Sequence, residues 1–235
     1  GGAAWRLLRV YVTQAEFGGL ELSAGDAVAP SVKPALRGFV FGDSYIETAS
    51  VYGTAPVFAL AHTLGRVVGW ENFYAGQAGT GYTMNGGGGG KTKYNSTGRI
   101  AGIVSCSPDF LVAFGTVNDD ANHASVESEA TAFYAAIGDE LPDTKIIVFG
   151  PPWTGTPTAN RLANRDALQA AAESAPNVIA FHDPIAEAWA NSGNSATLVG
   201  ADGAHYTQVG YDYLGARMGS VVSADIEALA ASLAA

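Results

Sequence analysis

Cysteine, basic residues and long apolar runs are all scarce in this chain of 235 residues. Its single cysteine, Cys106, excludes an intrachain disulfide and a cysteine-rich metal site. Lysine and arginine number 12 against 22 acidic residues, for a net charge of -10, and they form no dense basic cluster. No run approaches the ~18 apolar residues of a membrane span. We therefore expect no nucleic-acid partner and no membrane insertion, but a soluble protein acting on neutral or weakly charged molecules.

The composition favours one large folded domain. Hydrophobic residues make up 48% of the chain and charged residues only 14%, which permits a sizeable core and argues against long disordered segments. Residues 38–235 contain no internal repeat and no linker that would divide them. We expect them to form a single domain. Neither the oligomeric state nor the cellular compartment follows from these features.

Residues 1–37 have a different character. Trp5–Val12 and Gly19–Ser23 have the pattern of two short β segments, with turn-forming residues near each. This pattern predicts a β appendage on the main domain, or the end of an upstream β domain. The chain opens with Gly-Gly and shows no signal peptide, so a mature exported form and a fragment of a longer chain are both open.

The stretch Gly38–Ser44 organises the rest of the chain. Its apolar run Phe39–Phe41 stops abruptly at Gly42-Asp43-Ser44. An apolar run without polar alternation is typical of a strand buried on both faces of a parallel sheet. Ser44 would then lie just past the carboxyl end of a strand, where open α/β sheets bind ligands. Alone, such a serine is either a helix N-cap or a nucleophile.

Strand and helix patterns alternate five times after this point. Strands are predicted over 39–41, 69–75, 110–114, 146–149 and 178–181, and helices over about 54–66, 125–141 (with Ser125 as N-cap), 158–174 and the last residues from about 214. The Gly-rich, polar residues 85–99 predict a mobile surface loop. The alternation indicates an α/β fold, a three-layer α/β/α sandwich with a five-stranded parallel, flavodoxin-like sheet.

Polar residues suited to catalysis follow several of these strands. They are Ser44, Gly79, Asn118, Asp202 and His205. Each alone has a common structural interpretation as a cap, a turn residue or a loop hydrogen bond. A parallel sheet, however, brings the carboxyl ends of its strands to one edge, so these residues are expected to meet there.

Ester cleavage requires this set of groups. A serine hydroxyl becomes a good nucleophile when an imidazole removes its proton, and a carboxylate orients that imidazole. Asp202 lies three residues before His205 and can turn back onto its ring. The backbone N–H groups of Ser44 and Gly79 and the side-chain amide of Asn118 could bind the oxyanion of the tetrahedral intermediate.

Residues 38–235 resemble the SGNH hydrolase superfamily, also called GDSL-type esterases. Four blocks carry the resemblance in order: Gly42-Asp43-Ser44, a glycine after the second strand matched to Gly79 (or its neighbour Gly76), Gly115-x-x-Asn118-Asp119, and Asp202-x-x-His205 before the final helix. Tyr45 stands where many members have Leu, and Tyr206 stands where Pro is common. The resemblance implies a catalytic triad of Ser44, His205 and Asp202, an oxyanion hole of Ser44, Gly79 and Asn118, and no cofactor.

Within this family, we expect a serine esterase that works through an acyl-enzyme. The β appendage favours O-acetyl groups of a carbohydrate as substrate, and a general short-chain esterase or lipase, a thioesterase and an acyltransferase remain alternatives. Tyr45, Trp153 and His123 are candidate substrate-binding residues. Asp43 and Asp119 are expected to brace turns rather than react.

Two other activities are disfavoured by their motifs. Asn85–Thr92 nearly matches the phosphate-binding G-x-x-x-x-G-K-[ST] loop, but its first residue is Asn and no apolar helical stripe follows Lys91. We expect a flexible loop there that could help to enclose substrate. No Gly-x-Ser-x-Gly elbow exists, which argues against an α/β-hydrolase. No metal site is expected, and His62 and His182 are predicted to be structural.

Overall fold

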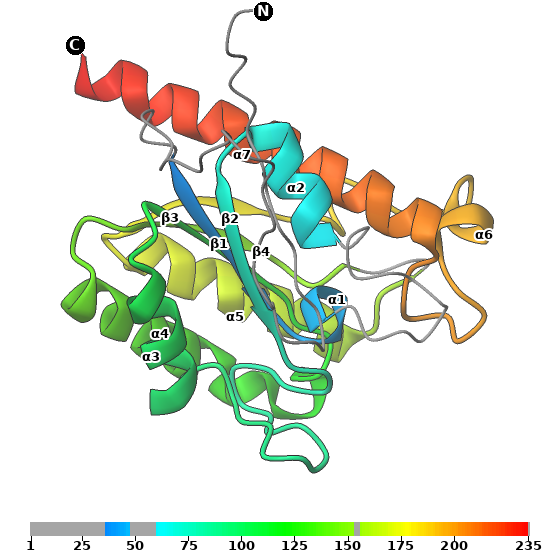
Figure 1. Ribbon diagram of the computed structural model, residues 1–235. Helices are drawn as coiled ribbons and strands as arrows, with labels where there is room; N and C mark the ends of the chain where they lie inside the picture. The colour runs from blue at the N-terminus through cyan, green and yellow to red at the C-terminus, as the bar shows by residue number, and fades with distance from the viewer. Residues whose placement is uncertain (1–35, 48–59, 153–155, 235) are drawn as a thin grey trace, which may run out of the picture. The chain divides into compact units, whose positions relative to one another are not determined.

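The computed structural model describes residues 36–47, 60–152 and 156–234, whose centre is a five-stranded parallel sheet in the order β2-β1-β3-β4-β5 (Figure 1). The strands are β1 (Arg37–Gly42), β2 (Glu71–Gly76), β3 (Phe110–Phe114), β4 (Lys145–Phe149) and β5 (Val178–His182). The helices are α1 (Ser44–Glu47), α2 (Leu60–Val68), α3 (Thr97–Cys106), α4 (Val126–Glu140), α5 (Ala159–Ser174), α6 (Ser195–Leu198) and α7 (Gln208–Leu233), with a 3₁₀ helix η2 (Asp120–Ser125) before α4.

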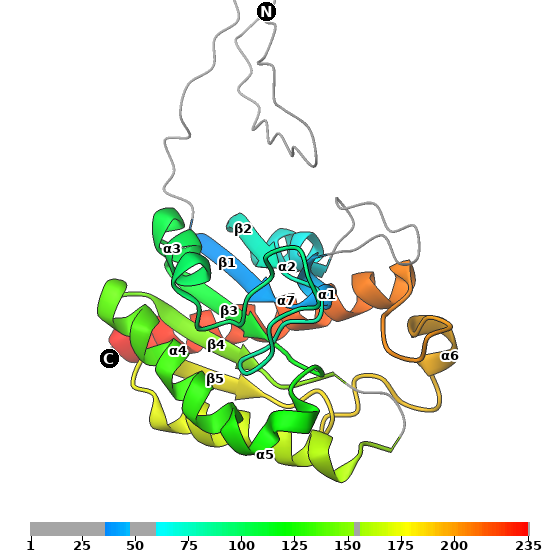
Figure 2. The same cartoon turned by 90° about the horizontal axis from the view of Figure 1, so that it is seen from below.

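Helices cover both faces of the sheet, which confirms the predicted three-layer α/β/α sandwich (Figure 2). Alternate strand residues point to opposite faces. Val112 and Phe114 of β3 join a core cluster that includes residues of α2 and α7. Leu111 and Ala113 join a second cluster with residues of α3, α4 and α5. All five residues of β3 are buried, as expected of a central strand with two covered faces.

The strand order places a switch point between β1 and β3. The chain runs from β1 outward to β2 and then crosses back over β1 to form β3 on its other side. In doubly wound sheets, a crevice opens where the direction of winding reverses, at the carboxyl ends of the strands. Ser44 follows β1 and Asn118 follows β3. The topology therefore brings these two predicted site residues to one place.

Two local predictions differ in part from the structure. The loop predicted over 85–99 ends early, because α3 begins at Thr97. This helix buries only Arg99 and Ile103, so its apolar stripe is too weak to stand out in the sequence. Ser125 occupies the N-cap position of α4 as predicted, but its side chain makes no capping hydrogen bond, because η2 runs directly into that helix.

Other expectations fall partly beyond the described residues. The helix predicted from about residue 54 is seen from Leu60 onward, and nearly all of the predicted β appendage lies outside the described residues, as does Trp153. Among the helices that the structure describes, none is both long and apolar enough to cross a membrane.

Glycines allow α7 to pack closely on α2. A Cβ built on Gly215 would lie 2.7 Å from the carbonyl oxygen of Leu60 and 2.8 Å from Cβ of Thr63. Gly219, one turn later, similarly approaches Val67. Since these contacts involve backbone and branched side chains, the two helices would have to separate to accommodate a methyl group.

We expect Gly215→Ala to lower the free energy of unfolding by about 1–3 kcal/mol, because overpacking outweighs the gain of about 1 kcal/mol in helix propensity. Gly102→Ala is the matched control, since a Cβ there meets no atom within 4 Å. It should raise stability by about 0.5–1 kcal/mol. Urea denaturation measures both changes, and equal effects would contradict close packing at Gly215.

Candidate active site

Ser44, His205 and Asp202 form a continuous hydrogen-bonded chain. Nε2 of His205 lies 2.9 Å from Oγ of Ser44. Nδ1 of the same ring lies 2.7 Å from Oδ2 of Asp202. Ser44 is the first residue of α1 and is only 7% exposed, whereas the side chains of His205 and Asp202 are 25% and 35% exposed. The hydroxyl is thus held at the base of an accessible site, with the imidazole nearer to solvent.

Asp202 shapes the loop that carries His205. Its Oδ1 accepts the backbone N–H groups of Ala204 and His205, each at 3.0 Å, while Oδ2 pairs with the imidazole. The carboxylate of Asp202 therefore both stabilises the turn and orients the imidazole ring of His205. Such Asx turns are a common use of aspartate in loops. The spacing of three residues between the aspartate and the histidine makes this double role possible.

Two contacts fix the chain directly after His205. An antiparallel bridge joins Val199 to Tyr206, which is 1% exposed. Thr207 then caps α7, with its Oγ1 accepting the N–H of Gly210 at 3.1 Å. The imidazole that contacts Ser44 is therefore carried by a segment that is held in place by its packing.

Tyr45 supports the same loop from beneath. It is 2% exposed, its ring lies 5.7 Å from that of His205, and its hydroxyl donates to the carbonyl of Ala204 at 2.7 Å. A role in holding the histidine loop fits these contacts better than the predicted contact with substrate. Tyr45 thus links α1, which begins at Ser44, to the loop that carries His205.

The carboxylate of Asp43 ties the nucleophile turn to the loop after β3. Its Oδ1 accepts the N–H of Tyr45 at 3.0 Å, and its Oδ2 accepts the hydroxyl of Thr116 at 2.8 Å and the amide of Asn118 at 3.2 Å. Asp43 is completely buried, and burial raises its pKa from an ordinary 3.8 to about 6. The predicted bracing role matches these contacts.

Asn118 reaches the site from the loop after β3. Its Nδ2 donates to the carbonyl of Thr80 at 2.9 Å and, over a longer 3.2 Å, to Asp43. Both N–H groups thus face protein acceptors, and the amide would serve an oxyanion by exchanging the weaker bond. Gly79 lies in the neighbouring loop with φ +75°, and its predicted role as a backbone donor stays a prediction. Gly76 instead packs against the nucleophile turn, where a Cβ would lie 2.0 Å from the backbone nitrogen of Glu47.

Asp119 braces the loop that follows Gly79. It is fully buried and accepts hydrogen bonds from the backbone of Tyr82, Thr83 and Met84 and from the hydroxyl of Thr83. Burial raises its pKa. A Cβ on Gly81 would lie 2.4 Å from this carboxylate, so only glycine fits beside it. Asp119 therefore has a structural role, as predicted.

Two supporting side chains were missed by sequence reasoning. Glu47, at the end of α1, accepts the backbone N–H of Ala78 and binds Nζ of Lys91 through both oxygens, at 3.0 and 3.1 Å. Lys91 therefore anchors the Gly-rich loop, a role unlike phosphate binding. Arg99 donates to the carbonyl of Gly42 at 2.7 Å, directly before the nucleophile turn. No sequence motif marks either residue.

Comparison with known proteins gives this geometry a family context. No family model matches the chain. Over 89 residues it is 36% identical to the GDSL lipase Rv0518 of Mycobacterium tuberculosis, a match that covers 36% of each chain. The match to a GDSL lipase and the convergence of the sequence blocks agree. In this segment and in its sequence blocks, the chain resembles the SGNH superfamily of GDSL-type hydrolases.

Several solved structures resemble this chain in fold. A family two carbohydrate esterase from Clostridium thermocellum superimposes with a TM-score of 0.66 at 17% identity, over 86% of this chain and 67% of the other. The salicylyl-acyltransferase SsfX3 of a tetracycline biosynthetic pathway gives 0.61 at 16% identity, over 89% and 60%. At these identities the likeness concerns the fold alone. The chain spans about a third of the length of the curated lipase that it matches.

Three further histidines lie apart from the contacts among Ser44, His205 and Asp202. His123 is half-buried in η2, where its Nδ1 lies 3.0 Å from the carbonyl of Asp120, so its role toward substrate stays a prediction. His182 pairs with Asp225 at 2.8 Å, and His62 packs edge-on against Tyr74. These two histidines have structural contacts, as expected.

We predict that Tyr45→Phe lowers kcat about 3- to 10-fold, because loss of one hydrogen bond of about 1 kcal/mol loosens the loop carrying His205. The KM for a small ester should stay within about twofold, since the side chain of Tyr45 is almost fully buried. Steady-state kinetics on wild type and variant measure both. A rise in KM at constant kcat would instead indicate direct contact with substrate.

The raised pKa of Asp43 predicts a pH dependence of stability. Between its ordinary value of 3.8 and about 6, the folded protein holds a proton that the unfolded chain has released. The free energy of unfolding should therefore fall as pH rises through this window, by about 2–3 kcal/mol from this group.

Urea denaturation of wild type and Asp43→Asn at pH 4, 5, 6 and 7 isolates this contribution. Other carboxylates act equally in both proteins, so their difference reports Asp43. Wild type should lose stability relative to the variant between pH 4 and 6 and then level off. Parallel curves would contradict the assignment.

Proposed function

We propose that this chain is a serine ester hydrolase that works through an acyl-enzyme. The observation that carries the proposal is the unbroken hydrogen-bonded chain from Asp202 through His205 to Ser44, at 2.7 and 2.9 Å. A hydroxyl, an imidazole and a carboxylate in this order are the groups that acyl transfer requires. Their position at the switch point of the sheet supports the same conclusion.

Each group has a defined task in the proposed reaction. Nε2 of His205 takes the proton of Ser44 as Oγ attacks the ester carbonyl, and Asp202 stabilises the resulting imidazolium. The backbone N–H of Ser44, with Gly79 and Asn118, stabilises the oxyanion. His205 then protonates the leaving alcohol, and an acyl-enzyme remains. Water, deprotonated by the same imidazole, releases the carboxylic acid and restores Ser44.

For the substrate, we propose acetyl esters, with O-acetyl groups of a carbohydrate as the first candidate. The fold likeness to a carbohydrate esterase supports this choice by analogy, and the exposure of His205 suits a bulky polar alcohol group. The second candidate is acyl transfer to another alcohol, which the fold likeness to an acyltransferase favours. Both reactions would use the same triad and differ in the acceptor.

We expect wild type to hydrolyse p-nitrophenyl acetate faster than the butyrate and octanoate, and to release acetate from acetylated xylo-oligosaccharides. Ser44→Ala should lose activity by about 10³-fold or more, because no nucleophile remains. Ser220→Ala is the matched control, since this exposed serine of α7 lies outside the site and bonds only the carbonyl of Ala216.

The outcomes separate the candidates. Activity retained in Ser44→Ala would overturn the catalytic assignment. Preference for octanoate over acetate would overturn the acetyl specificity. Acetyl transfer to an added sugar at a rate above hydrolysis would favour the acyltransferase.

A further inference from the structure

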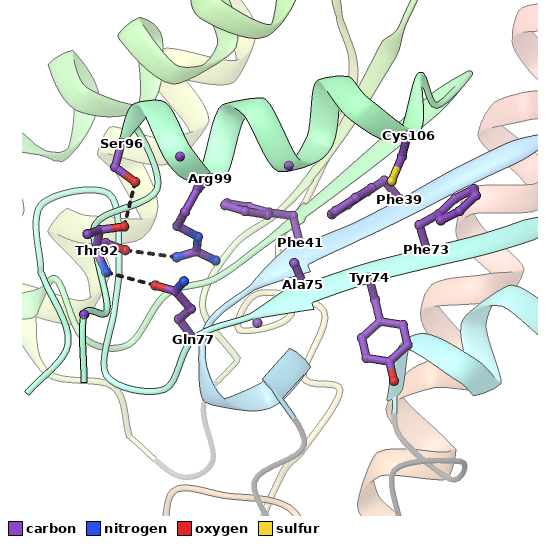
Figure 3. Close-up of a pocket in the computed structure, with 14 residues that line it drawn as sticks. Phe39, Phe41, Phe73, Tyr74, Ala75, Gln77, Thr92, Ser96, Arg99 and Cys106 are labelled. Carbon is purple, nitrogen blue, oxygen red and sulfur yellow. Dashed lines mark hydrogen bonds between the residues drawn. The ribbon is translucent and has the colours of Figure 1, made fainter. Parts of the chain in front are cut away.

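A second concave site lies beside the catalytic edge, between α3 and the strands β1 and β2. It has a volume of about 610 Å³, within the range of about 300–1,000 Å³ that small-molecule sites occupy. Figure 3 shows its walls, with α3 on one side and the two strands on the other. Ser44, Asp202 and His205 do not line it. The cavity, here called the α3 groove, is therefore separate from the triad.

The walls of the α3 groove are apolar along most of its length. The strands contribute Phe39, Phe41 and Phe73, and α3 contributes Gly98, Gly102 and Cys106. A Cβ built on either glycine meets no atom within 4 Å. The helix thus presents bare backbone to open space, opposite aromatic rings. A flat or extended hydrocarbon group would fit between them.

A buried cation lies at the end of the groove nearest the nucleophile turn. Arg99 is only 7% exposed and stacks over Phe41, with its guanidinium 4.0 Å from the ring centroid. Its hydrogen bonds go to the carbonyls of Gly42 and Thr92 and the hydroxyl of Thr80, all of them neutral groups. Within the described part of the chain, no carboxylate forms an ion pair with it.

The charge of Arg99 is therefore incompletely balanced by its surroundings. Burial lowers its pKa, and Tyr94, Asp43 and Glu47 raise it from a distance. Glu47 is itself paired with Lys91. An arginine stays protonated in spite of burial, and a buried charge without a counter-ion is costly.

Arg99 and Gln77 each keep an N–H donor that bonds no acceptor among the described residues. The hydrogen bonds of Arg99 use its two Nη atoms, and the amide of Gln77 uses its Oε1 to accept the N–H of Thr92. Among the described residues, no acceptor bonds Nε of Arg99 or Nε2 of Gln77. Both residues line the groove and lie at the same end of it (Figure 3).

We propose that the α3 groove binds an apolar carboxylic acid, with an aromatic or medium-length aliphatic group. Its carboxylate would accept hydrogen bonds from Arg99 and Gln77, and its hydrocarbon part would lie between the phenylalanine rings and the glycine face of α3. The charge of Arg99 favours an anion over a neutral ligand. The apolar walls favour an anion with a hydrocarbon group over inorganic phosphate or acetate. This site is additional to the proposed ester hydrolysis and does not depend on turnover.

The test uses isothermal titration of octanoate into Ser44→Ala protein, in which no acyl-enzyme forms. Octanamide serves as the neutral ligand of equal shape. Octanoate should bind, and octanamide should bind about tenfold more weakly or not at all, since the charge-assisted hydrogen bonds are lost. Equal binding of the two ligands would overturn the role of Arg99, and absence of octanoate binding would overturn the site.

The variant Gly102→Phe tests whether octanoate binds in the α3 groove. Because a Cβ at Gly102 meets no atom within 4 Å, the phenyl group can enter the groove without disturbing the fold, and octanoate affinity should fall at least about tenfold. Ala101→Phe adds the same bulk at an exposed neighbouring position of α3 that does not line the groove, and it should leave the affinity unchanged.

Arg99→Met should reduce octanoate affinity by a similar factor, and circular dichroism checks its folding. Octanoate binding that persists at full strength in Gly102→Phe would place the ligand elsewhere, including the catalytic cleft, and would overturn the proposal. Esterase activity is measured separately on wild-type protein. A failure of the proposed acid binding can therefore be distinguished from a failure of the proposed ester hydrolysis.

Discussion

The buried carboxylate of Asp43 holds together the sheet edge that carries Ser44 and Asn118. Three donors converge on it: the backbone N–H of Tyr45, the hydroxyl of Thr116 and the amide of Asn118. These groups come from the segments after β1 and β3, which flank the switch point of the sheet. Because burial disfavours the ionised form, the three donors offset a large desolvation cost. The nucleophile turn and the Asn118 loop are thereby fixed relative to each other.

A second set of contacts extends this constraint to the glycine-rich loop. The carbonyl of Thr80 accepts from both Thr116 and Asn118, and its hydroxyl accepts from Arg99. Arg99 in turn bonds the carbonyl of Gly42. The three segments around Ser44 thus share one continuous polar network beneath the surface. Arg99 also lines the α3 groove, so the proposed acid site is connected to the turn at Ser44 through this one side chain.

Much of this arrangement was predictable from the sequence. Phe39–Phe41 and Phe110–Phe114 are uninterrupted apolar runs ending in glycine, so their strands and the polar residues after them stand out. The sheet order then brings Ser44 and Asn118 together. Asp202 and His205 are three residues apart, and their pairing follows from that spacing.

The supporting contacts were not predictable, for physical reasons. Arg99 lies 57 residues from its partner Gly42, in a helix whose two glycines conceal its apolar stripe. Glu47 meets Lys91 across 44 residues. Tyr45 directly follows Ser44, but its hydrogen-bond partner, Ala204, lies 159 residues away. Contacts of this kind depend on the packing of elements, and no local pattern encodes them.

The placement of Asp202 and His205 on one short loop has a consequence for how such a site can change over time. The base and its orienting carboxylate are joined by contacts within four residues, and the bridge between Val199 and Tyr206 closes the loop behind them. Insertions or deletions in the long stretch between α1 and this loop can alter the surroundings of the site without separating the pair. Asp202 and His205, the proposed orienting carboxylate and base, would therefore stay paired while loops outside the polar network around Ser44 change in length and sequence.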